Sequence, residues 1–177
     1  MLHRVVDEGD VRRGLRARQA VADGPADLSA DWLGVDGRVA VAEESGRLLE
    51  IDHCARLEAA FRSVGIHQLI AVSNDPLLAE DLVYNLDAAK EDLAAFSDEF
   101  SGINALLVPA HSVDVAVLCT VDDFHLVAGS PGFVLSYAGD AAVLRREFLA
   151  FAEGHFEVMH PVLRRAARYM DWIGGSG

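Results

Sequence analysis

"INALLVPAHSVDVAVLCTVDDFHLVAG", residues 103 to 129, is the stretch that decides the fold. It contains three runs rich in branched aliphatic residues, at 103 to 110, 113 to 121 and 124 to 129. Such runs favour buried β-strands, and only two residues connect each run to the next. Because a parallel crossover needs about a dozen residues or more, we expect consecutive antiparallel strands. The stretch therefore predicts the centre of an antiparallel sheet.

A strand and a long helix are predicted before this stretch. Residues 66 to 73 form another branched aliphatic run, which is typical of a central strand. From 76 to about 99, apolar residues recur with the 3.6-residue period of a helix. Asp75 is placed to cap the amino end of that helix, and Pro76 fits its first position, where no N–H is needed. We therefore expect a long helix whose acidic residues lie on the outer face.

Two further elements are predicted nearer the start of the chain. Residues 38 to 51 contain two short β-prone runs around Glu44-Ser45-Gly46, a pattern that indicates a hairpin. A helix is expected next, with Asp52 as its N-cap. It extends to about Val64, where Gly65 ends it.

A helical tail is predicted after the three strands. A short helix from Phe133 to Ala138 precedes it, and one apolar stripe then runs from Leu144 to Ile173. Pro161 removes a backbone hydrogen bond inside this tail, so a kink is expected there. The fold class that follows is α+β. It has a mixed, largely antiparallel sheet of about five to six strands in the order ββαβαβββαα, covered by the long acidic helix and the kinked C-terminal helix.

The chain is expected to divide into three parts. Residues 1 to 37 form an N-terminal arm with a short helix at 8 to 22 and a connector rich in Gly, Pro, Asp and Ser, which Trp32 anchors to the body. Residues 38 to 173 form a single α+β domain, a size at which a chain buries a core without disulfides or metal. Residues 174 to 177, "GGSG", are expected to be a flexible tail.

The composition is that of an ordinary folded protein, with 51% hydrophobic and 24% charged residues. No apolar run reaches the roughly 18 residues of a membrane span, and charge near the start argues against a signal peptide. We therefore expect a cytoplasmic location. Cys54 and Cys119 lie far apart without metal-ligand spacing, so neither a disulfide framework nor a zinc site is expected. Arginine outnumbers lysine so strongly that a bacterial source of high GC content is indicated.

The net charge of −13 repels nucleic acids and anionic membranes, so neither is an expected partner. The acids are concentrated between residues 75 and 100, a segment that contains eight acidic residues and one basic residue. This concentration can attract a basic partner or simply keep the protein in solution.

One stretch of the chain has the spacing of half a metal site. "EGHFEVMHP", residues 153 to 161, places Glu153, Glu157 and His160 at the spacing that brings side chains to one helix face. A di-iron bundle needs two such Glu-x-x-His motifs, and the chain has one. We therefore interpret these residues as a solvated helix edge beside a hinge, and keep them only as weak candidates. With no other cofactor motif present, no metal or cofactor is expected.

The candidate ligand-binding residues lie where predicted strands end. Ser73, Asn74 and Asp75 follow a strand and precede a helix, a corner that can hold an anion, although Asp75 can equally be only a cap. His125 and Ser130 form a second group, which lacks the GxSxG motif of a nucleophilic serine.

These observations favour binding over catalysis. The first hypothesis is an accessory or regulatory protein that binds another protein and forms a homodimer through its C-terminal helix. The expected partner-binding residues are Asp81, Asp87, Glu91, Asp98, Phe151, Tyr169 and Trp172. One alternative is a small-molecule-binding domain or minor enzyme with its pocket near Ser73, Asn74, His125 and Ser130. The other is an acidic, immunity-like inhibitor of a basic protein.

Overall fold

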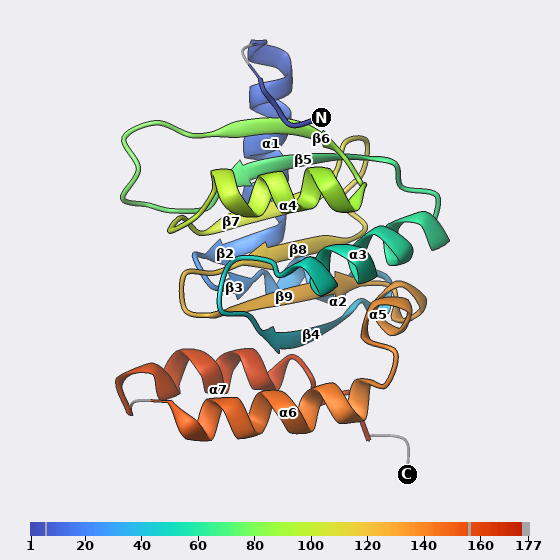
Figure 1. Cartoon of the computed structure of the whole chain (residues 1–177), viewed down its shortest axis with the longest axis vertical. Helices are drawn as coiled ribbons and strands as arrows, with labels where there is room; N and C mark the ends of the chain where they lie inside the picture. Colours follow the sequence, from blue (N-terminus) through green and yellow to red (C-terminus); the bar gives the residue numbers. More distant parts are fainter. Residues whose placement is uncertain (6, 156, 175–177) are drawn as a thin grey trace.

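The centre of the molecule is a seven-stranded antiparallel sheet, described here from a computed structural model (Figure 1). The structure describes residues 1–5, 7–155 and 157–174. The strand order is β1-β6-β5-β7-β8-β9-β4. The strands are β1 (His3–Arg4), β4 (Val39–Glu44), β5 (Gln68–Ser73), β6 (Val83–Asp87), β7 (Ala105–Pro109), β8 (Ala116–Cys119) and β9 (Phe124–Gly129), and a separate small sheet pairs β2 (Ala22–Gly24) with β3 (Asp27–Leu28). The predicted α+β class is confirmed.

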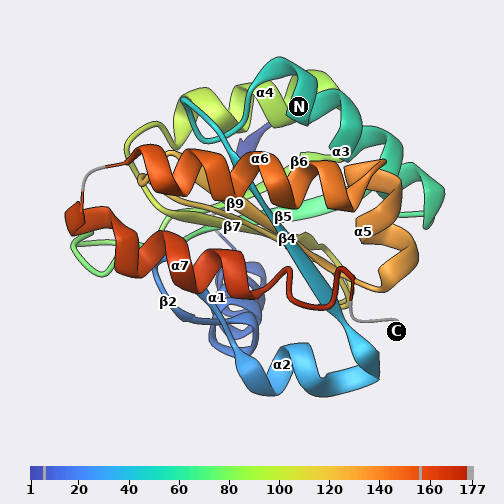
Figure 2. The same ribbon diagram turned by 90° about the horizontal axis from the view of Figure 1, so that it is seen from below.

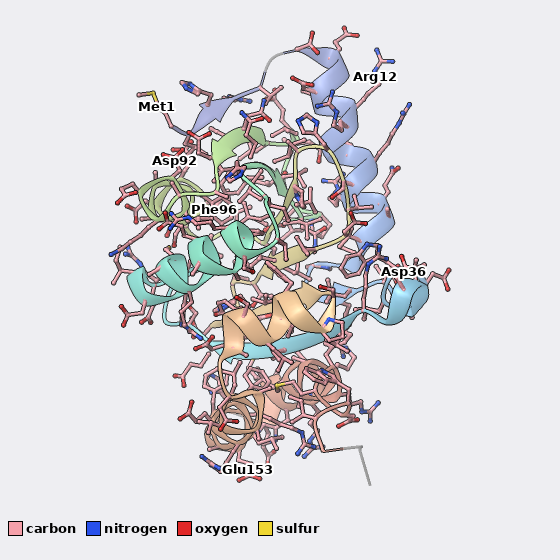
Figure 3. All side chains as sticks on the ribbon, turned by 90° about the vertical axis from the view of Figure 1, so that its right-hand side faces the viewer. Met1, Arg12, Asp36, Asp92, Phe96 and Glu153 are labelled. Atoms are coloured by element: carbon pink, nitrogen blue, oxygen red, sulfur yellow. The ribbon has the colours of Figure 1, made fainter. Side chains whose placement is uncertain are left out.

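Helices cover both faces of the sheet and one of its edges. They are α1 (Glu8–Val21), α2 (Ala30–Gly34), α3 (Ile51–Ser63), α4 (Lys90–Glu99), α5 (Pro131–Ala138), α6 (Ala141–Gly154) and α7 (His160–Arg168), with 3-10 turns η1 (Val35–Gly37) and η2 (Glu157–Met159). One face carries α3, α4 and α5, and the opposite face carries α1 and α2 (Figure 3). The α6–α7 pair runs along the β4 edge (Figure 2). No helix among the described residues combines the length and the apolar character that crossing a membrane requires.

The three strands predicted between 103 and 129 are confirmed as β7, β8 and β9. They pair antiparallel in sequence order, with Leu106 opposite Leu118 and Leu118 opposite Leu126. Every residue of these strands is buried, because helices cover both faces. The strand predicted at 66 to 73 is confirmed as β5, which pairs with β7 on one side and β6 on the other.

The helix predicted from 76 to about 99 is wrong over its first half. Residues 83 to 87 form β6, and helix α4 begins only at Lys90. The buried strand β5 needs a backbone partner on its open side, and β6 supplies it while Val83 and Leu86 enter the core. This pairing outweighs the local helical period. Asp75 therefore caps no helix; its carboxylate accepts a hydrogen bond from the Leu77 amide in a turn (2.9 Å).

The hairpin predicted at 38 to 51 is also wrong. Its first half is β4, which pairs along its whole length with β9 rather than with the residues that follow it. Leu48 and Leu49 are buried without strand pairing, and the Leu49 backbone exchanges hydrogen bonds with the Ser97 hydroxyl of α4. Glu50, and not Asp52, is the N-cap of α3.

The C-terminal segment is a pair of helices rather than one kinked helix. Gly154 is the last residue of α6, and Pro161 lies in the first turn of α7, where its missing N–H costs nothing. The two helices lie side by side below β4 (Figures 1 and 2). The Trp172 indole N–H donates to the Ala40 carbonyl on the outer edge of β4 (2.8 Å). The pair therefore covers a strand edge that would otherwise be open to pairing with another chain.

The N-terminal residues pack on the sheet. The helix predicted at 8 to 22 is confirmed as α1, in which Gly14, Ala17 and Val21 are buried and Val11 and Leu15 are partly buried against the core. A Cβ on Gly14 would lie 3.0 Å from a Val83 methyl, so glycine is what lets the helix approach β5 and β6. Trp32 is buried as expected, and its indole donates to the Val113 carbonyl (2.6 Å). Of the predicted flexible tail, residues 175–177 lie outside the described residues.

Both cysteines are free and buried in the core, Cys54 on α3 and Cys119 on β8. Burial raises the pKa of the Cys54 thiol to about 11 and raises that of Cys119 further. Both side chains therefore act as small core residues.

A pair of glycine variants tests the packing at the end of β9. A Cβ on Gly129 would lie 2.7 Å from a Val115 methyl, so Gly129→Ala is expected to lower the free energy of unfolding by about 1 to 3 kcal/mol. On the neighbouring helix α5, Gly132 is exposed with open space around its Cα. Gly132→Ala is expected to raise the same quantity by up to about 1 kcal/mol. Urea unfolding of both variants measures the two changes in the free energy of unfolding. Equal changes would contradict the close packing at Gly129.

The Trp172 contact gives a second test. Trp172→Phe keeps an aromatic ring but leaves the Ala40 carbonyl without its donor, and the expected loss of stability is about 1 kcal/mol. Urea unfolding followed by circular dichroism measures it. A variant as stable as the parent chain would show that water replaces the indole at no cost.

Candidate functional site

Five polar side chains meet inside the protein between the sheet and helices α3 and α5. Glu43 of β4 lies opposite His125 of β9 in the strand register, so both point to the same face. Helix α3 brings His53 and Arg56 to that face, one turn apart, and α5 brings Tyr137. We call these five residues the Glu43 network.

The Glu43 carboxylate is the centre of the network and accepts hydrogen bonds on both oxygens. Arg56 Nη2 lies 2.5 Å from Oε1, and His53 Nε2 lies 3.4 Å from the same oxygen. The Tyr137 hydroxyl donates to Oε2 at 2.5 Å. The Arg56 guanidinium also lies over the Tyr137 ring, 4.5 Å from its centroid. The buried charge is thereby both paired and hydrogen-bonded, which is the condition for burying it.

The hydrogen bonds determine which imidazole nitrogen carries the proton. The Glu50 amide donates to His53 Nδ1 (3.1 Å), so the proton of neutral His53 is on Nε2, facing Glu43. The Tyr137 hydroxyl gives its own proton to Glu43, so it accepts from His125 Nε2 (2.7 Å). His125 Nδ1 is then a buried acceptor with no partner among the described residues.

This environment moves the pKa of each acid or base in a definite direction. Burial favours the neutral carboxyl, but the hydrogen bond from His53 and the neighbouring His125, Arg56 and Tyr137 lower the pKa of Glu43 to about 2. Burial, together with the nearby His53, lowers the pKa of His125 to about 3. Burial and Glu43 raise the pKa of Tyr137 well above its ordinary value. At neutral pH, the network is therefore a charged carboxylate paired with the Arg56 guanidinium, beside the neutral imidazole of His125 and the neutral phenol of Tyr137.

Glu43, His53 and His125 also have the composition of a divalent-metal site, with ligand atoms within 4.8 Å of one another. The hydrogen bonds do not fit that use. Both Nε2 atoms carry protons that would have to leave, and metal at His53 would require breaking the bond from the Glu50 amide. The Arg56 guanidinium already occupies the carboxylate and would repel a cation. We therefore interpret the network as a structural one.

An acidic pocket opens beside the network. It has a volume of about 340 Å³ and lies between the end of β4, the loop that follows and helix α6. Its lining residues are Glu43, Glu44, Gly46, Glu50, Leu144, Glu147 and Phe148. Four carboxylates face an apolar wall of two side chains, and no described basic residue lines the pocket. Glu44 and Glu147 are exposed, and neither forms an ion pair with any described residue. The negative charge of this pocket is therefore only partly compensated.

The structure separates the two groups of predicted ligand-binding residues. Ser73 is buried, and its hydroxyl accepts the Leu82 amide (2.9 Å). Asn74 donates to the Gly24 carbonyl (2.8 Å) and, with Asp75, lines a hollow of about 480 Å³ beside α1. Their main contacts are thus within the fold.

The other two predicted residues lie elsewhere. His125 is in the Glu43 network on β9, and two strands, β7 and β8, separate it from Ser73 on β5. Ser130 follows the far end of β9 and caps α5, where its hydroxyl accepts the Phe133 amide. No pocket described here joins Ser73, Asn74, His125 and Ser130.

The predicted partner-binding acids do not form one helical row. Asp81 pairs with Arg18 in the loop before β6 (2.5 Å), and Asp87 pairs with the terminal amine at the end of β6 (3.3 Å). Glu91 and Asp98 are exposed on α4, where Asp98 pairs with Arg47 (3.0 Å). The acids are therefore distributed along a loop, a strand and a helix.

The aromatic residues of the C-terminal segment are used within the chain. Tyr169 exchanges hydrogen bonds with the Leu28 backbone (2.9 and 3.2 Å), and Trp172 caps the β4 edge. The Phe151 ring packs on Phe148, with centroids 5.6 Å apart. These contacts account for the aromatics without a second copy of the chain, and the homodimer stays a prediction.

The weak metal candidates lie on three different elements. Glu153 is at the end of α6, on the outer side of the molecule (Figure 3), Glu157 is in η2 and His160 begins α7. The helix that would have brought them to one face ends at Gly154. His160 Nε2 bonds to the His155 carbonyl instead (2.8 Å).

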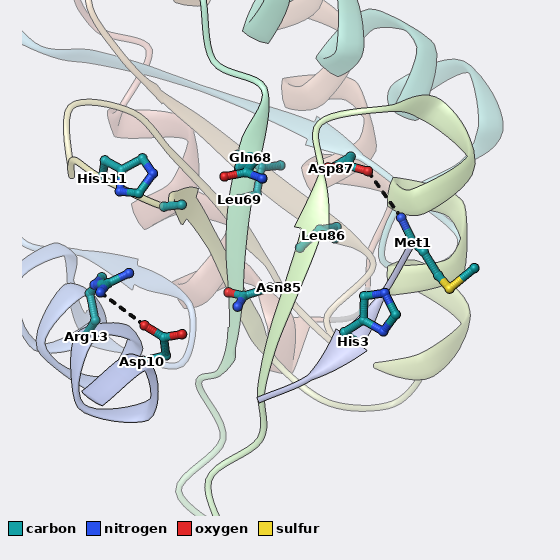
Figure 4. Close-up of a pocket in the computed structure, with 11 residues that line it drawn as sticks. Met1, His3, Asp10, Arg13, Gln68, Leu69, Asn85, Leu86, Asp87 and His111 are labelled. Atoms are coloured by element: carbon teal, nitrogen blue, oxygen red, sulfur yellow. Dashed lines mark hydrogen bonds and ion pairs between the residues drawn. The ribbon is translucent and has the colours of Figure 1, made fainter. Parts of the chain in front are cut away.

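Three further hollows meet around His111 on the α1 side of the sheet. Figure 4 shows one of them, of about 470 Å³, with His111 above Arg13 and the Arg13–Asp10 ion pair on α1. The second, of about 510 Å³, continues along α1, and the third, of about 440 Å³, reaches Gly65.

Sequence reasoning missed Glu43, His53, Arg56 and Tyr137 as a group. They lie on three elements, up to 94 residues apart, and share no local spacing. The one available signal was Glu43, which follows four apolar residues in a strand. A carboxylate among buried residues needs donors or a cation to compensate its charge.

No protein-family model, curated protein or solved structure matches this chain.

The Glu43 network makes stability depend on pH. His125 has a folded-state pKa of about 3 against an ordinary value of 6.5, so the unfolded chain binds a proton that the folded chain excludes. Between these two values, acidification is expected to lower the free energy of unfolding by up to about 1.4 kcal/mol per pH unit. Glu43 adds a loss in the same direction between pH 4.5 and about 2.

His125→Gln removes this proton linkage, so stability between pH 5 and 6.5 is expected to vary less than in the parent chain. Urea unfolding at a series of pH values measures the slope. His67→Asn, at an exposed histidine, serves as the control and is expected to keep the parent slope. Equal slopes in all three proteins would contradict the buried neutral imidazole.

Proposed function

We propose that the protein is a non-catalytic binding protein that engages a basic protein partner, with the acidic pocket receiving an arginine or lysine side chain. The observation that carries the proposal is the pocket itself: four carboxylates opposite the apolar wall of Leu144 and Phe148. A long basic side chain has the matching form, with an apolar stem and a cationic head.

The Glu43 network supports this role because it fixes one wall of the pocket. Glu43 is held by donors from two helices and stays ionised at every ordinary pH. Its neighbour Glu44 lies at the end of the same strand, and Glu147 faces it from α6. Because Glu43 is paired with Arg56 and the Glu50 carboxylate accepts the Gly46 amide (3.2 Å), the free charge offered to a partner comes mainly from Glu44 and Glu147.

Arginine fits this pocket better than lysine. Its planar guanidinium offers five N–H donors and pairs with carboxylates in two parallel hydrogen bonds, whereas an ammonium is a point charge. The net charge of −13 adds a long-range attraction that speeds encounter with a basic partner. This proposal unites the two protein-binding hypotheses drawn from the sequence.

A defined peptide tests the pocket. A six-residue peptide with two arginines is expected to bind, and its counterpart with citrulline, which has the same shape but no charge, is expected not to. Nuclear magnetic resonance is expected to show the largest shift at the Gly46 amide, which lies in the pocket lining. Binding should weaken as salt is added.

Charge reversal provides the matched comparison. Glu44→Lys with Glu147→Lys is expected to weaken binding of the arginine peptide at least about ten-fold, a change of about 1.4 kcal/mol. Glu91→Lys with Glu153→Lys changes the net charge equally at exposed positions outside the pocket and is expected to have little effect. If both double variants lose binding equally, general charge and not the pocket is responsible.

A further inference from the structure

The groove between α1 and the sheet differs in charge from the other hollows of the molecule. It has a volume of about 510 Å³, within the range of small-molecule sites, and its lining residues are Arg13, Arg16, Ala17, Ala20, Ile70, Val108, Pro109, Ala110, His111, Ser112 and Val113. No described acidic residue lines it, although carboxylates line each of the other four hollows described above. We call it the α1 groove.

The floor of the α1 groove is apolar. Ile70 and Val108 are neighbours on β5 and β7, and both are buried. The Ile70 side chain faces α1, since a Cβ on Gly14 would lie 3.3 Å from its methyl. Ala17 and Ala20 form the helix wall with small side chains, which leave space above the sheet.

The rim of the groove is basic. Arg13 and Arg16 are exposed on α1, and Arg16 forms no ion pair with any described residue. Figure 4 shows the ion pair of Arg13 with Asp10 (3.0 Å). Asp10 does not line the α1 groove. His111 and Ser112 add donors from the loop after β7, and the Trp32 bond to the Val113 carbonyl holds that loop in place.

We propose that the α1 groove binds an organic anion with an apolar body, of the class of medium-chain carboxylates. The carboxylate lies between Arg13 and Arg16, and the hydrocarbon part lies against Ala20, Ala110 and Val113, the apolar lining residues that keep accessible surface. A positive rim over an apolar floor favours a ligand that has both a negative charge and a hydrocarbon chain over a ligand that has only one of the two. In a chain of net charge −13, an anion is otherwise repelled, so binding depends on these two arginines.

Octanoate is a suitable probe, measured by isothermal titration calorimetry on the full chain. It is expected to bind one to one. Octanamide, which has the same chain without the charge, is expected to bind at least about ten times more weakly. Octylammonium and inorganic phosphate are expected not to bind, because the first has the wrong charge and the second has no apolar body. Equal affinities for octanoate and octanamide would overturn the proposal, and so would the absence of octanoate binding.

Variants locate the site. Arg13→Gln with Arg16→Gln is expected to weaken octanoate binding at least about ten-fold, and Ala20→Phe is expected to abolish it by filling the groove. The control is Arg12→Gln with Arg146→Gln, which removes the same charge at exposed positions outside the groove; Figure 3 shows Arg12 on the outer side of α1.

Each pattern of results decides the question. Loss in both test variants with an unaffected control supports the groove. Loss in the arginine variant alone places the anion on the arginines outside the groove and overturns the proposal, as does unchanged binding in both. Circular dichroism melting of every variant verifies folding, and a destabilised Ala20→Phe is replaced by Ala20→Leu. Arginine-peptide binding at the acidic pocket is an independent measurement, so failure of either proposal leaves the other intact.

Discussion

The Glu43 carboxylate is the constraint around which this half of the molecule is arranged. A charge on the inner face of β4 requires donors, and no residue of its own strand or of the neighbouring strand neutralises it. The donors come from α3 and α5, so both helices are held at defined positions over β4 and β9. The same contact fixes the first turn of α3, because His53 bonds to the Glu50 amide while it faces Glu43. A satisfied buried polar network of this kind specifies one arrangement of the packed layers, whereas apolar contacts alone tolerate several.

The edges of the sheet are the second constraint. β4 is a six-residue outer strand, long enough to pair with another chain, and α6, α7 and Trp172 cover it. The opposite edge is β1, which has only two residues. The covering helices also complete the acidic pocket, since Leu144, Glu147 and Phe148 all belong to α6. Protection of an edge and construction of a binding surface are thus performed by the same segment.

The predictable parts of the fold are those in which the local sequence pattern favours the same structure as the tertiary contacts. The strands between 103 and 129 are apolar throughout and joined by short turns, so periodicity and connection length lead to one answer. Residues 83 to 87 show the opposite case. Their apolar positions fit a helical period, and only the requirement of β5 for a partner, which no local pattern contains, makes them a strand. The prediction of a hairpin at 38 to 51 was wrong for the same reason, because the partner of β4 is β9, 80 to 90 residues away.

The candidate sites were less accessible to sequence reasoning than the fold. His125 was singled out as a strand-end polar residue, but its neighbours come from elements whose packing the sequence does not state. The α1 groove depends on Gly14 and on two alanines, which attract no attention in a search for chemistry. Net charge was more informative. In a chain of net charge −13, a hollow lined by arginines and no acid, such as the α1 groove, is an exception.

The two cysteines carry a practical consequence. They lie in facing layers, Cys54 on α3 and Cys119 on β8, with thiols that are shielded and hard to ionise. A maleimide or disulfide reagent reaches them only when the helical layer separates from the strands beneath it. The speed of their modification therefore reports how often the native protein opens, and no cysteine has to be introduced for the measurement.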